Sequence, residues 1–436
     1  MGRGHAVVIG AGISGLLVAR VLSETYGRVT VLDRDDLPAG PRPRRGVPQG
    51  RQIHALLARG SDALEQLFDG FGAELDAGGA LRGDSQAETR WYVDGRRFHE
   101  GHAGLSVVAS TRPFLEHLVR RRVEALPGVE VVGATQVLGL LSAAATVTGV
   151  RTRHTSGTEE DLPADLVVDA AGRRSRTPIW LRELGFPAPT ESAVKADVVY
   201  VTQNYRYEPG MLDGMIGVAV TAYPGHPRSG IAVRQEGDTL SISLTGMFGA
   251  DPGTDPETML AFAETLAAPD IADALRSAVP LNQPLKMRYP GSTRLHYEQL
   301  KRFPAGYLVC GDAICSFNPI YGQGMTIAAL EALELRRLLA DGTENLGRRF
   351  FDAIKPVIGT AWGLSSAADL RFPEVEGTRP PFDGLRNRYL ASYYRAAGID
   401  PSLGAAFLRV SNMVDSPLRL VSPRIMLRVF RALRAA

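Results

Sequence analysis

The sequence contains few of the residues that define several large protein classes. Only four of its 49 basic residues are lysines, and it has two cysteines, Cys310 and Cys315. So few cysteines exclude a disulfide-stapled fold and are typical of the reducing cytosol, so we expect a cytoplasmic protein. No apolar run is long enough to span a membrane, and no apolar segment with a small-residue cleavage site follows Met1. We therefore expect neither a spanning helix nor a secretory leader.

Charge and size exclude a further class of function. The 436 residues carry a formal net charge of only +2, with 22% charged and 44% apolar residues. Because the two signs are interspersed, the chain lacks the basic tract of a nucleic-acid binder, and we expect no nucleic-acid partner. The length is sufficient for two or three packed units.

The first forty residues contain a dinucleotide-binding pattern. A continuous apolar run over 5–9 predicts a strand that is buried on both faces. The glycine-rich stretch from Gly10 to Gly15 follows at once, and after a helical pattern a second predicted strand ends at Asp33. A glycine-rich turn between a strand and a helix, with an acid at the end of the next strand, is the dinucleotide-binding βαβ fingerprint.

Each residue of this fingerprint has a physical role. Gly10 permits the tight turn, Gly12 lets the backbone approach a pyrophosphate, and Gly15 allows the helix to pack closely on the strand. The free N–H groups of the helix N-terminus attract phosphate, and Asp33 is expected to accept hydrogen bonds from ribose hydroxyls. No second fingerprint occurs, which argues against enzymes with two separate dinucleotide domains.

Two later segments distinguish FAD from NAD. Residues 165–175 resemble the "DG" segment of single-component flavoprotein monooxygenases, with Ala171 in place of the usual Asp. Residues 307–313, which include Gly311 and Asp312, resemble their "GD" segment and lead through 318–326 into a predicted helix. The resemblance covers residues 5–370. It implies bound FAD and NAD(P)H as a transient reductant, acting either directly or through a partner reductase.

The residues of the second segment suit a flavin. Gly311 and Asp312 end a buried strand, where α/β sheets bind ligands, and a carboxylate there suits ribityl hydroxyls. The next helix would point its N–H groups at the electron-rich edge of the flavin ring, and a pyrophosphate needs a cation such as Arg42 or Arg112. Position by position, the resemblance implies FAD contacts at Ile13, Ser14, Asp33, Arg34, Arg42, Arg112, Val137, Asp312 and Met325, in segments that also contain Gly311, Pro319, Gly322, Gly324 and Thr326.

The resemblance also indicates a type of reaction. Gly324-Met325-Thr326 is similar to squalene epoxidases, and residues 45–50 with 315–319 are similar to bacterial polyether epoxidases. This implies transfer of one oxygen atom of O₂, through a hydroperoxide at flavin C4a, to an alkene of a large apolar polyketide or terpenoid secondary metabolite. Such a reaction needs no protein nucleophile, and no metal-ligating cluster is evident. His54 is the one candidate for a catalytic side chain.

Several different functions are compatible with the same motifs. An aromatic (phenol) hydroxylase is the main one, although Cys315 stands where most hydroxylases of the family carry His. A flavin-fold halogenase would need an early lysine, and the first lysine is Lys195. A prenyl reductase would carry an aromatic-Trp-Phe-Pro signature, in which none of Trp91, Trp180 and Trp362 lies. A non-oxidative cyclase on the same fold also stays open.

The predicted architecture is an α/β fold with three parts. A discontinuous Rossmann-like FAD-binding domain covers 1–75, 100–185 and 295–370, and an antiparallel-sheet substrate domain covers 76–99 and 186–294. A helical region covers 371–436. The apolar spacing over 53–68 predicts an amphipathic helix that contains His54. A last, basic amphipathic helix carries Ile425, Met426, Val429, Phe430 and Leu433 on one face. We expect it to cap the substrate domain rather than to lie on a membrane surface.

Overall fold

In the computed structural model, which describes residues 4–435, the N-terminal motif forms a strand, a helix and a parallel strand. These are β1 (His5–Ile9), α1 (Ile13–Leu22) and β2 (Arg28–Leu32). Three more strands complete a parallel sheet of order β21-β12-β1-β2-β8, namely β8 (Val129–Val132), β12 (Leu166–Asp169) and β21 (Tyr307–Val309). Because all neighbours pair in parallel, their carboxyl ends lie at one edge of the sheet.

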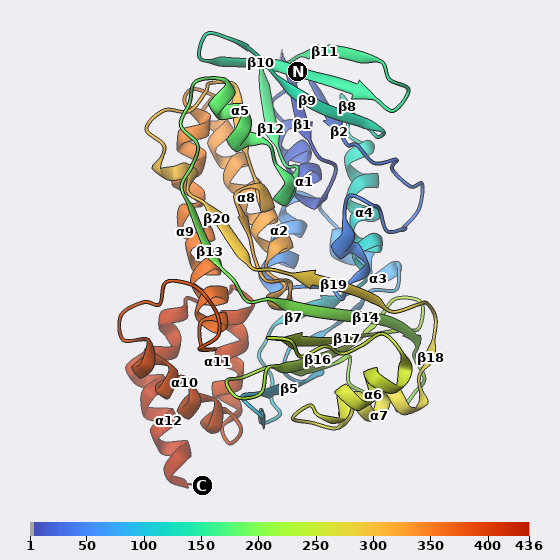
Figure 1. Cartoon of the computed structure of the whole chain (residues 1–436), viewed down its shortest axis with the longest axis vertical. Helices are drawn as coiled ribbons and strands as arrows, with labels where there is room; N and C mark the ends of the chain where they lie inside the picture. The colour runs from blue at the N-terminus through green and yellow to red at the C-terminus, as the bar shows by residue number, and fades with distance from the viewer. Residues whose placement is uncertain (1–3, 436) are drawn as a thin grey trace.

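Helices cover this sheet and bury one large apolar core (Figure 1). Helix α1 packs against two of them, α4 (Arg112–Glu124) and α8 (Gly324–Ala340). The others are α2 (Ala58–Leu67), α3 (Phe71–Ala77), α5 (Thr177–Glu183) and the long α9 (Leu346–Asp369). Helix α9 runs along the molecule from the parallel sheet towards the C-terminal helices (Figure 1).

Three small sheets surround this body. One contains β9 (Thr135–Ala143), β10 (Thr146–His154) and β11 (Glu159–Pro163). The second contains β13 (Glu191–Val194), β20 (Ser292–Leu295) and β22 (Cys315–Ser316). The third contains β3 (Ala55–Leu56), β4 (Leu81–Asp84) and β7 (Ser106–Ala109).

A larger, mainly antiparallel sheet forms the other half of the molecule (Figure 1). Its strands are β5 (Thr89–Val93), β6 (Arg96–Arg97), β14 (Val198–Arg206), β15 (Gly217–Val220), β16 (Arg228–Gln235), β17 (Thr239–Met247), β18 (Val279–Pro280) and β19 (Leu285–Tyr289). Successive side chains of β14 alternate between two apolar clusters. Val201 packs with α6 (Pro256–Glu264) and α7 (Asp270–Ser277), whereas Val198 and Tyr200 face the end of α9.

The chain ends in three helices, α10 (Asp383–Ala397), α11 (Pro401–Ser411) and α12 (Pro423–Ala435). They share an apolar cluster with the β5–β6 hairpin, whose turn has left-handed backbone at Asp94 and Gly95. Within residues 4–435, no helix is long and apolar enough to cross a membrane.

The structure confirms the predicted α/β fold class, with a parallel nucleotide-type sheet, an antiparallel second sheet and a helical C-terminal region. The helix predicted over 53–68 is wrong in its first part. Ala55 and Leu56 pair with β7 as a short strand, and the helix begins only at Ala58. His54 therefore lies in an extended segment, because strand pairing overrides the helical spacing of its neighbours.

Candidate functional site

The glycine-rich loop has the conformation that its sequence predicts. Gly10 has a φ of +104°, and a Cβ there would lie 2.6 Å from the carbonyl oxygen of Ala170. A Cβ on Gly15 would overlap the carbonyl oxygen of Gly10. These two glycines are therefore required by the fold itself, since they let α1 and β12 approach β1.

Gly12 differs from both, because a Cβ built there meets no atom within 4 Å. It is the N-cap residue of α1, and no side chain of residues 4–435 caps that helix end. The N–H groups of Ile13 and Ser14 thus form an uncapped, positively polarised helix N-terminus behind an open backbone. This arrangement fits a phosphate group that approaches Gly12 closely.

The second segment meets this loop at the same edge of the parallel sheet. Gly311 has a φ of +67°, and a Cβ built on it would lie 2.6 Å from Ser14 Oγ. Its N–H donates to the buried Glu331 at 2.6 Å. Burial raises the pKa of Glu331 to about 8, so this carboxyl is mostly protonated at neutral pH. Asp312 follows, and its Oδ1 lies 3.8 Å from a Cβ placed on Gly324 at the start of α8.

Two arginines supply positive charge at this edge. Burial raises the pKa of Asp312, and the charges of Arg112 and Arg173 act in the opposite direction. Arg112 is the first residue of α4 and is itself buried. The structure thus brings Arg112 and Asp312 together with the glycine loop, as their predicted phosphate and ribityl contacts require.

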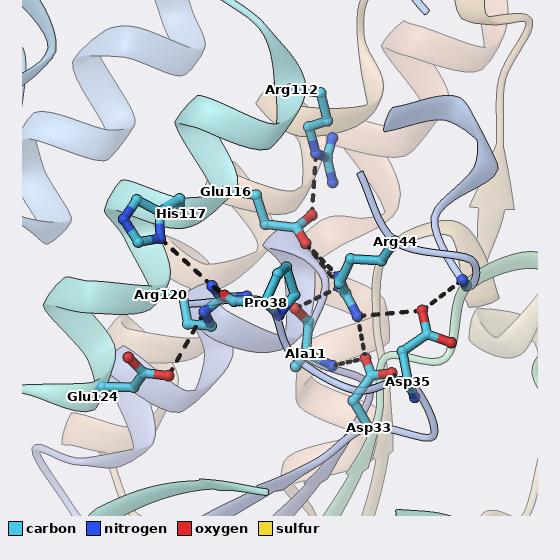
Figure 2. A network of polar contacts seen from close by, with 11 residues as sticks. Ala11, Asp33, Asp35, Pro38, Arg44, Arg112, Glu116, His117, Arg120 and Glu124 are labelled. Carbon is cyan, nitrogen blue, oxygen red and sulfur yellow. Dashed lines mark hydrogen bonds and ion pairs between the residues drawn. The ribbon is translucent and has the colours of Figure 1, made fainter. Parts of the chain in front are cut away.

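Asp33 is the centre of a buried charge network that the sequence did not reveal (Figure 2). Its Oδ2 accepts the N–H of Ala11 at 2.8 Å and Arg44 Nη1 at 2.9 Å. Arg44 also donates to Glu116 Oε1 at 2.8 Å and to the carbonyl of Ala11 at 2.9 Å. Glu116 then accepts Arg112 Nε at 3.3 Å. One chain of contacts therefore joins the end of β2, the glycine loop and the N-terminal turn of α4.

The basic loop after β2 uses a different arginine from the one the resemblance indicated. Arg42 is exposed and forms no side-chain hydrogen bond or ion pair within residues 4–435, whereas Arg44 is buried, with 8% of its surface exposed. Both lie in the run from Pro41 to Arg45. Alternation along extended chain would place Arg42 and Arg44 on the same side, so only the acidic partners of Arg44 decide which arginine turns inward. The role of Arg42 as an FAD contact stays a prediction.

The remaining predicted contacts lie on several sides of the site. Val137 is buried on β9, which packs beside β2, while Arg34 and Pro319 are exposed. Gly322 has left-handed backbone, and Met325 and Thr326 are buried in the first turn of α8. Their assignment to FAD contacts rests on the resemblance and on this common location.

His54 lies close to Arg112 but is not poised as an acid or base. Its Nδ1 is 3.0 Å from the carbonyl oxygen of Gln52. Burial, reinforced by the charge of Arg112, lowers the pKa of His54 to about 3. The imidazole is therefore neutral throughout the physiological range, and any role in the reaction is limited to hydrogen bonding.

In the degenerate "DG" segment, the buried carboxylate is Asp169, two positions before Ala171. Ala171 is exposed, whereas Asp169 is fully buried. Asp169 accepts the N–H of Ala171 at 2.8 Å and the hydroxyls of Ser175 and Thr177, each at 2.6 Å. The buried Asp169 side chain thus holds the turn after β12 together through these three hydrogen bonds.

A second buried network holds the turn between Asn318 and Gly322. Asp369, at the end of α9 and 2% exposed, accepts Asn318 Nδ2 at 3.1 Å and the hydroxyl of Tyr321 at 2.6 Å on the same oxygen. Tyr200, from β14, donates its hydroxyl to Asn318 Oδ1. The antiparallel sheet, the turn and α9 are therefore joined at one point. The sequence carried no motif for this, because Asp369 lies 51 residues beyond Asn318.

We expect Asp369→Asn to remove a pH dependence of stability. Burial raises the pKa of Asp369 to about 6, against hydrogen bonds from Tyr321 and Asn318 that lower it. The unfolded chain ionises this carboxyl near its ordinary pKa of about 4, so the wild type loses stability as the pH rises towards the folded pKa. The amide oxygen of Asn keeps both hydrogen bonds but does not titrate.

Urea unfolding at pH 4.5 and 7.5 measures this difference. The free energy of unfolding of Asp369→Asn should rise by about 2 kcal/mol relative to wild type between the two values. Asp62→Asn, at an exposed carboxyl of α2, is the matched control and should change little. Parallel pH profiles for Asp369→Asn and wild type would show that folding does not raise the pKa of this carboxyl.

The residues present fit a flavin dinucleotide. The uncapped start of α1 and Arg112 match a pyrophosphate, and Asp312 matches ribityl hydroxyls. One buried polar atom at the start of α8, Gln323 Oε1, has no hydrogen-bond partner within residues 4–435. Buried polar groups normally have partners, so this atom is available to a bound molecule. In the same residues, no cluster of His, Cys, Asp and Glu is placed to hold a metal ion.

Known proteins are similar to this chain in sequence and in fold. The family model described as "FAD binding domain" matches residues 4–348. Protein Rv3254 of Mycobacterium tuberculosis is 33% identical, with 95% of this chain and 90% of that protein covered. Squalene monooxygenase 1,2 of Brassica napus is 26% identical, with 84% and 68% covered. A triple mutant of the flavin-dependent brominase Bmp2 has a TM-score of 0.69 at 14% identity, with 99% of both chains covered, which is a likeness of fold.

Proposed function

We propose, since the chain belongs to the FAD binding domain family and is a flavoprotein monooxygenase, that it epoxidises an alkene in a large apolar substrate. Polyketides and terpenoids are the substrate classes of this kind. Relatives at low identity include a squalene monooxygenase. We infer the substrate class from the residues of this chain itself.

The observation that supports an apolar substrate is the cluster between the antiparallel sheet and the Asn318–Gly322 turn. Ile320, in that turn, packs against apolar side chains from the inner sheet face and from the end of α9. They include Val198, Met247, Met287, Trp362, Leu370 and Phe372. The same turn leads into α8, where the flavin ring is expected. We infer that a long hydrocarbon binds next to this apolar cluster, beside the reacting edge of the cofactor and away from water.

The chain's own residues would position and protect the reaction. FAD, when bound and reduced, supplies the activation of O₂. The start of α1, Arg112 and Asp312 would bind and orient it, and the start of α8 would stabilise negative charge on the flavin ring. The apolar cluster would exclude water, and Tyr200, Asn318 and Asp369 would hold the Asn318–Gly322 turn against the sheet. An epoxidation requires no further proton acceptor from the protein.

Hydroxylation of a phenol is the second candidate, and one observation favours it. Tyr321 donates its hydroxyl directly to Asp369, so a proton from a phenol could pass through this hydroxyl to the carboxyl. Tyr200 is linked to the same carboxyl only through the amide of Asn318, which does not relay protons. Burial raises the pKa values of both tyrosines well above 10, so neither hydroxyl acts as a base near neutral pH. Asp369 would have to be that base, and it is only 2% exposed, which is why we place epoxidation first.

A halogenase function has less support from the described residues. All four lysines are exposed, and Lys195 pairs with Glu376 at 2.8 Å on the surface. None lies in the apolar cluster, as a halogenase lysine would have to do. The resemblance to the brominase in fold does not bring its chemistry with it.

Oxygen transfer to defined compounds tests the proposal. Purified protein with NAD(P)H under ¹⁸O₂, with and without a general flavin reductase, is offered linear polyenes or simple phenols. The expected product is a polyene with one added ¹⁸O that acid opens to a diol. The arm without reductase also shows whether NAD(P)H reduces the flavin directly. Conversion of phenols to catechols with polyenes untouched would assign the hydroxylase function instead.

A further inference from the structure

Exposed apolar side chains are concentrated near the C-terminal end of the chain. Eight of the eleven strongly exposed large apolar residues within 4–435 lie between residues 382 and 430. They are Phe382, Leu385, Ile399, Leu418, Val421, Met426, Leu427 and Phe430. Single exposed apolar residues are normal on a protein surface, but such a concentration marks an interaction site.

Helix α12 shows how this exposure arises. Ile425, Val429 and Ala432 are buried against α10 and α11, and they form a narrow stripe at helical spacing. Met426 and Phe430 were predicted to share that buried face, and this prediction is wrong because they are 48% and 55% exposed. Leu427 is also 47% exposed. Met426, Leu427 and Phe430 thus form a second apolar stripe on α12, which the rest of residues 4–435 does not cover. The helix projects at the lower end of the molecule (Figure 1).

The charge of this region is opposite to that of the rest of the chain. Residues 371–436 contain eleven arginines and five acidic residues, a net charge of +6 in a chain whose total is +2. From Ser416 onward there are five arginines and no acidic residue. Arg419 and Arg428 pair with Asp415 and Asp400. The other three, Arg424, Arg431 and Arg434, are exposed and form no ion pair within residues 4–435.

In place of the cap on the substrate domain that the sequence pattern favours, we propose that α12, together with the preceding turn Pro417–Val421, docks on an anionic membrane surface. Met426, Leu427 and Phe430 enter the boundary between headgroups and acyl chains, and the unpaired arginines contact lipid phosphates. A helix with a projecting apolar stripe flanked by arginines has the composition of an interfacial helix. This contact is independent of the proposed epoxidation.

The same observations argue against two further kinds of partner. A nucleic acid would attract the arginines but offers no partner for Met426, Leu427 and Phe430 in its phosphate backbone. A second copy would bring two faces of like charge together, and this repulsion disfavours a symmetric dimer through α12. An anionic bilayer satisfies both the apolar and the charged side chains.

Flotation of the full-length FAD-bound protein with lipid vesicles tests the proposal. We expect binding to vesicles of phosphatidylcholine and phosphatidylglycerol, weaker binding in 0.5 M NaCl, and none to phosphatidylcholine alone. Replacing Arg424, Arg431 and Arg434 together by Gln should lower the affinity about a hundredfold, since each cation near the surface contributes about fivefold. Phe430→Ser should weaken vesicle binding, and the binding that remains should still decrease in 0.5 M NaCl.

Matched surface changes elsewhere are the controls. Leu281→Ser removes a side chain that is 49% exposed next to β18, and Arg96→Gln with Arg206→Gln removes exposed charges from the antiparallel sheet. Neither change should alter vesicle binding. Retained FAD absorbance and far-ultraviolet circular dichroism show that each variant is folded.

Two results would overturn the proposal. One is equal vesicle binding by the triple arginine variant and the wild type, or no binding by either. The other is concentration-dependent dimerisation that Phe430→Ser abolishes while vesicles do not compete, because this would assign the surface to a second copy of the chain. Vesicle binding is measured without substrate, so its failure leaves the proposed epoxidation unaffected.

Discussion

Gly12→Val should yield a folded protein that does not bind FAD. A valine side chain at this position meets no protein atom within 4 Å of its Cβ, and Gly12 has extended backbone with φ −77° and ψ 177°. The fold therefore tolerates the residue. The added methyl groups instead occupy the space in front of the helix N-terminus, where the pyrophosphate must approach the backbone. We expect the dissociation constant for FAD to rise at least about a hundredfold, a loss of roughly 3 kcal/mol of binding free energy.

Visible absorbance, with the mass of the cofactor released by heat, measures this loss. Gly139→Val on β9 is the matched control, because a Cβ there also meets no atom within 4 Å, and it should retain FAD. Gly15→Val is the contrasting variant: its Cβ would overlap the Gly10 carbonyl, so the protein itself should fail to fold. Normal FAD occupancy in Gly12→Val would mean that this loop does not hold the phosphates.

Arg44→Met should destabilise the protein by about 3–5 kcal/mol. The substitution leaves the buried Asp33 carboxylate without its cation and Glu116 with Arg112 alone, and breaking a buried ion pair from one side has an effect of this size. It also removes the donor to the carbonyl of Ala11, so the glycine loop should loosen and FAD affinity should fall. Arg44→Lys should recover little, because one ammonium cannot reproduce three directional contacts of the guanidinium.

Arg42→Met provides a control within the same loop. Arg42 is exposed, so this change should alter the free energy of unfolding by less than about 0.5 kcal/mol. Urea unfolding of the apoprotein and titration with FAD separate the two effects. Loss of FAD affinity in Arg42→Met without loss of stability would support the contact implied by the resemblance. Equal stability of Arg44→Met and wild type would show that the carboxylates are protonated or solvated when Arg44 is absent.

The parts of this protein whose cause is local could be predicted from its sequence. Gly10 must adopt a positive φ, the apolar run after His5 must be buried on both faces, and an Asp-Gly pair at Asp94 favours a tight hairpin turn. These constraints act between residues close in the chain. They were sufficient to predict the βαβ unit and the glycine loop, whereas the prediction of FAD also needed the resemblance of residues 165–175 and 307–313 to flavoprotein monooxygenases.

The features that depend on distant partners came from the tertiary fold. The choice of Arg44 over Arg42 follows from Glu116 and Asp33, which the fold brings to one side of the loop. Asp369 became part of the site because α9 ends beneath the Asn318–Gly322 turn. Helical spacing predicted an apolar face on α12, but α10 and α11 cover only part of that face and leave Phe430 exposed. A periodic pattern predicts which side chains lie on the same face of a helix. Only the packing against other elements determines how many of them are buried.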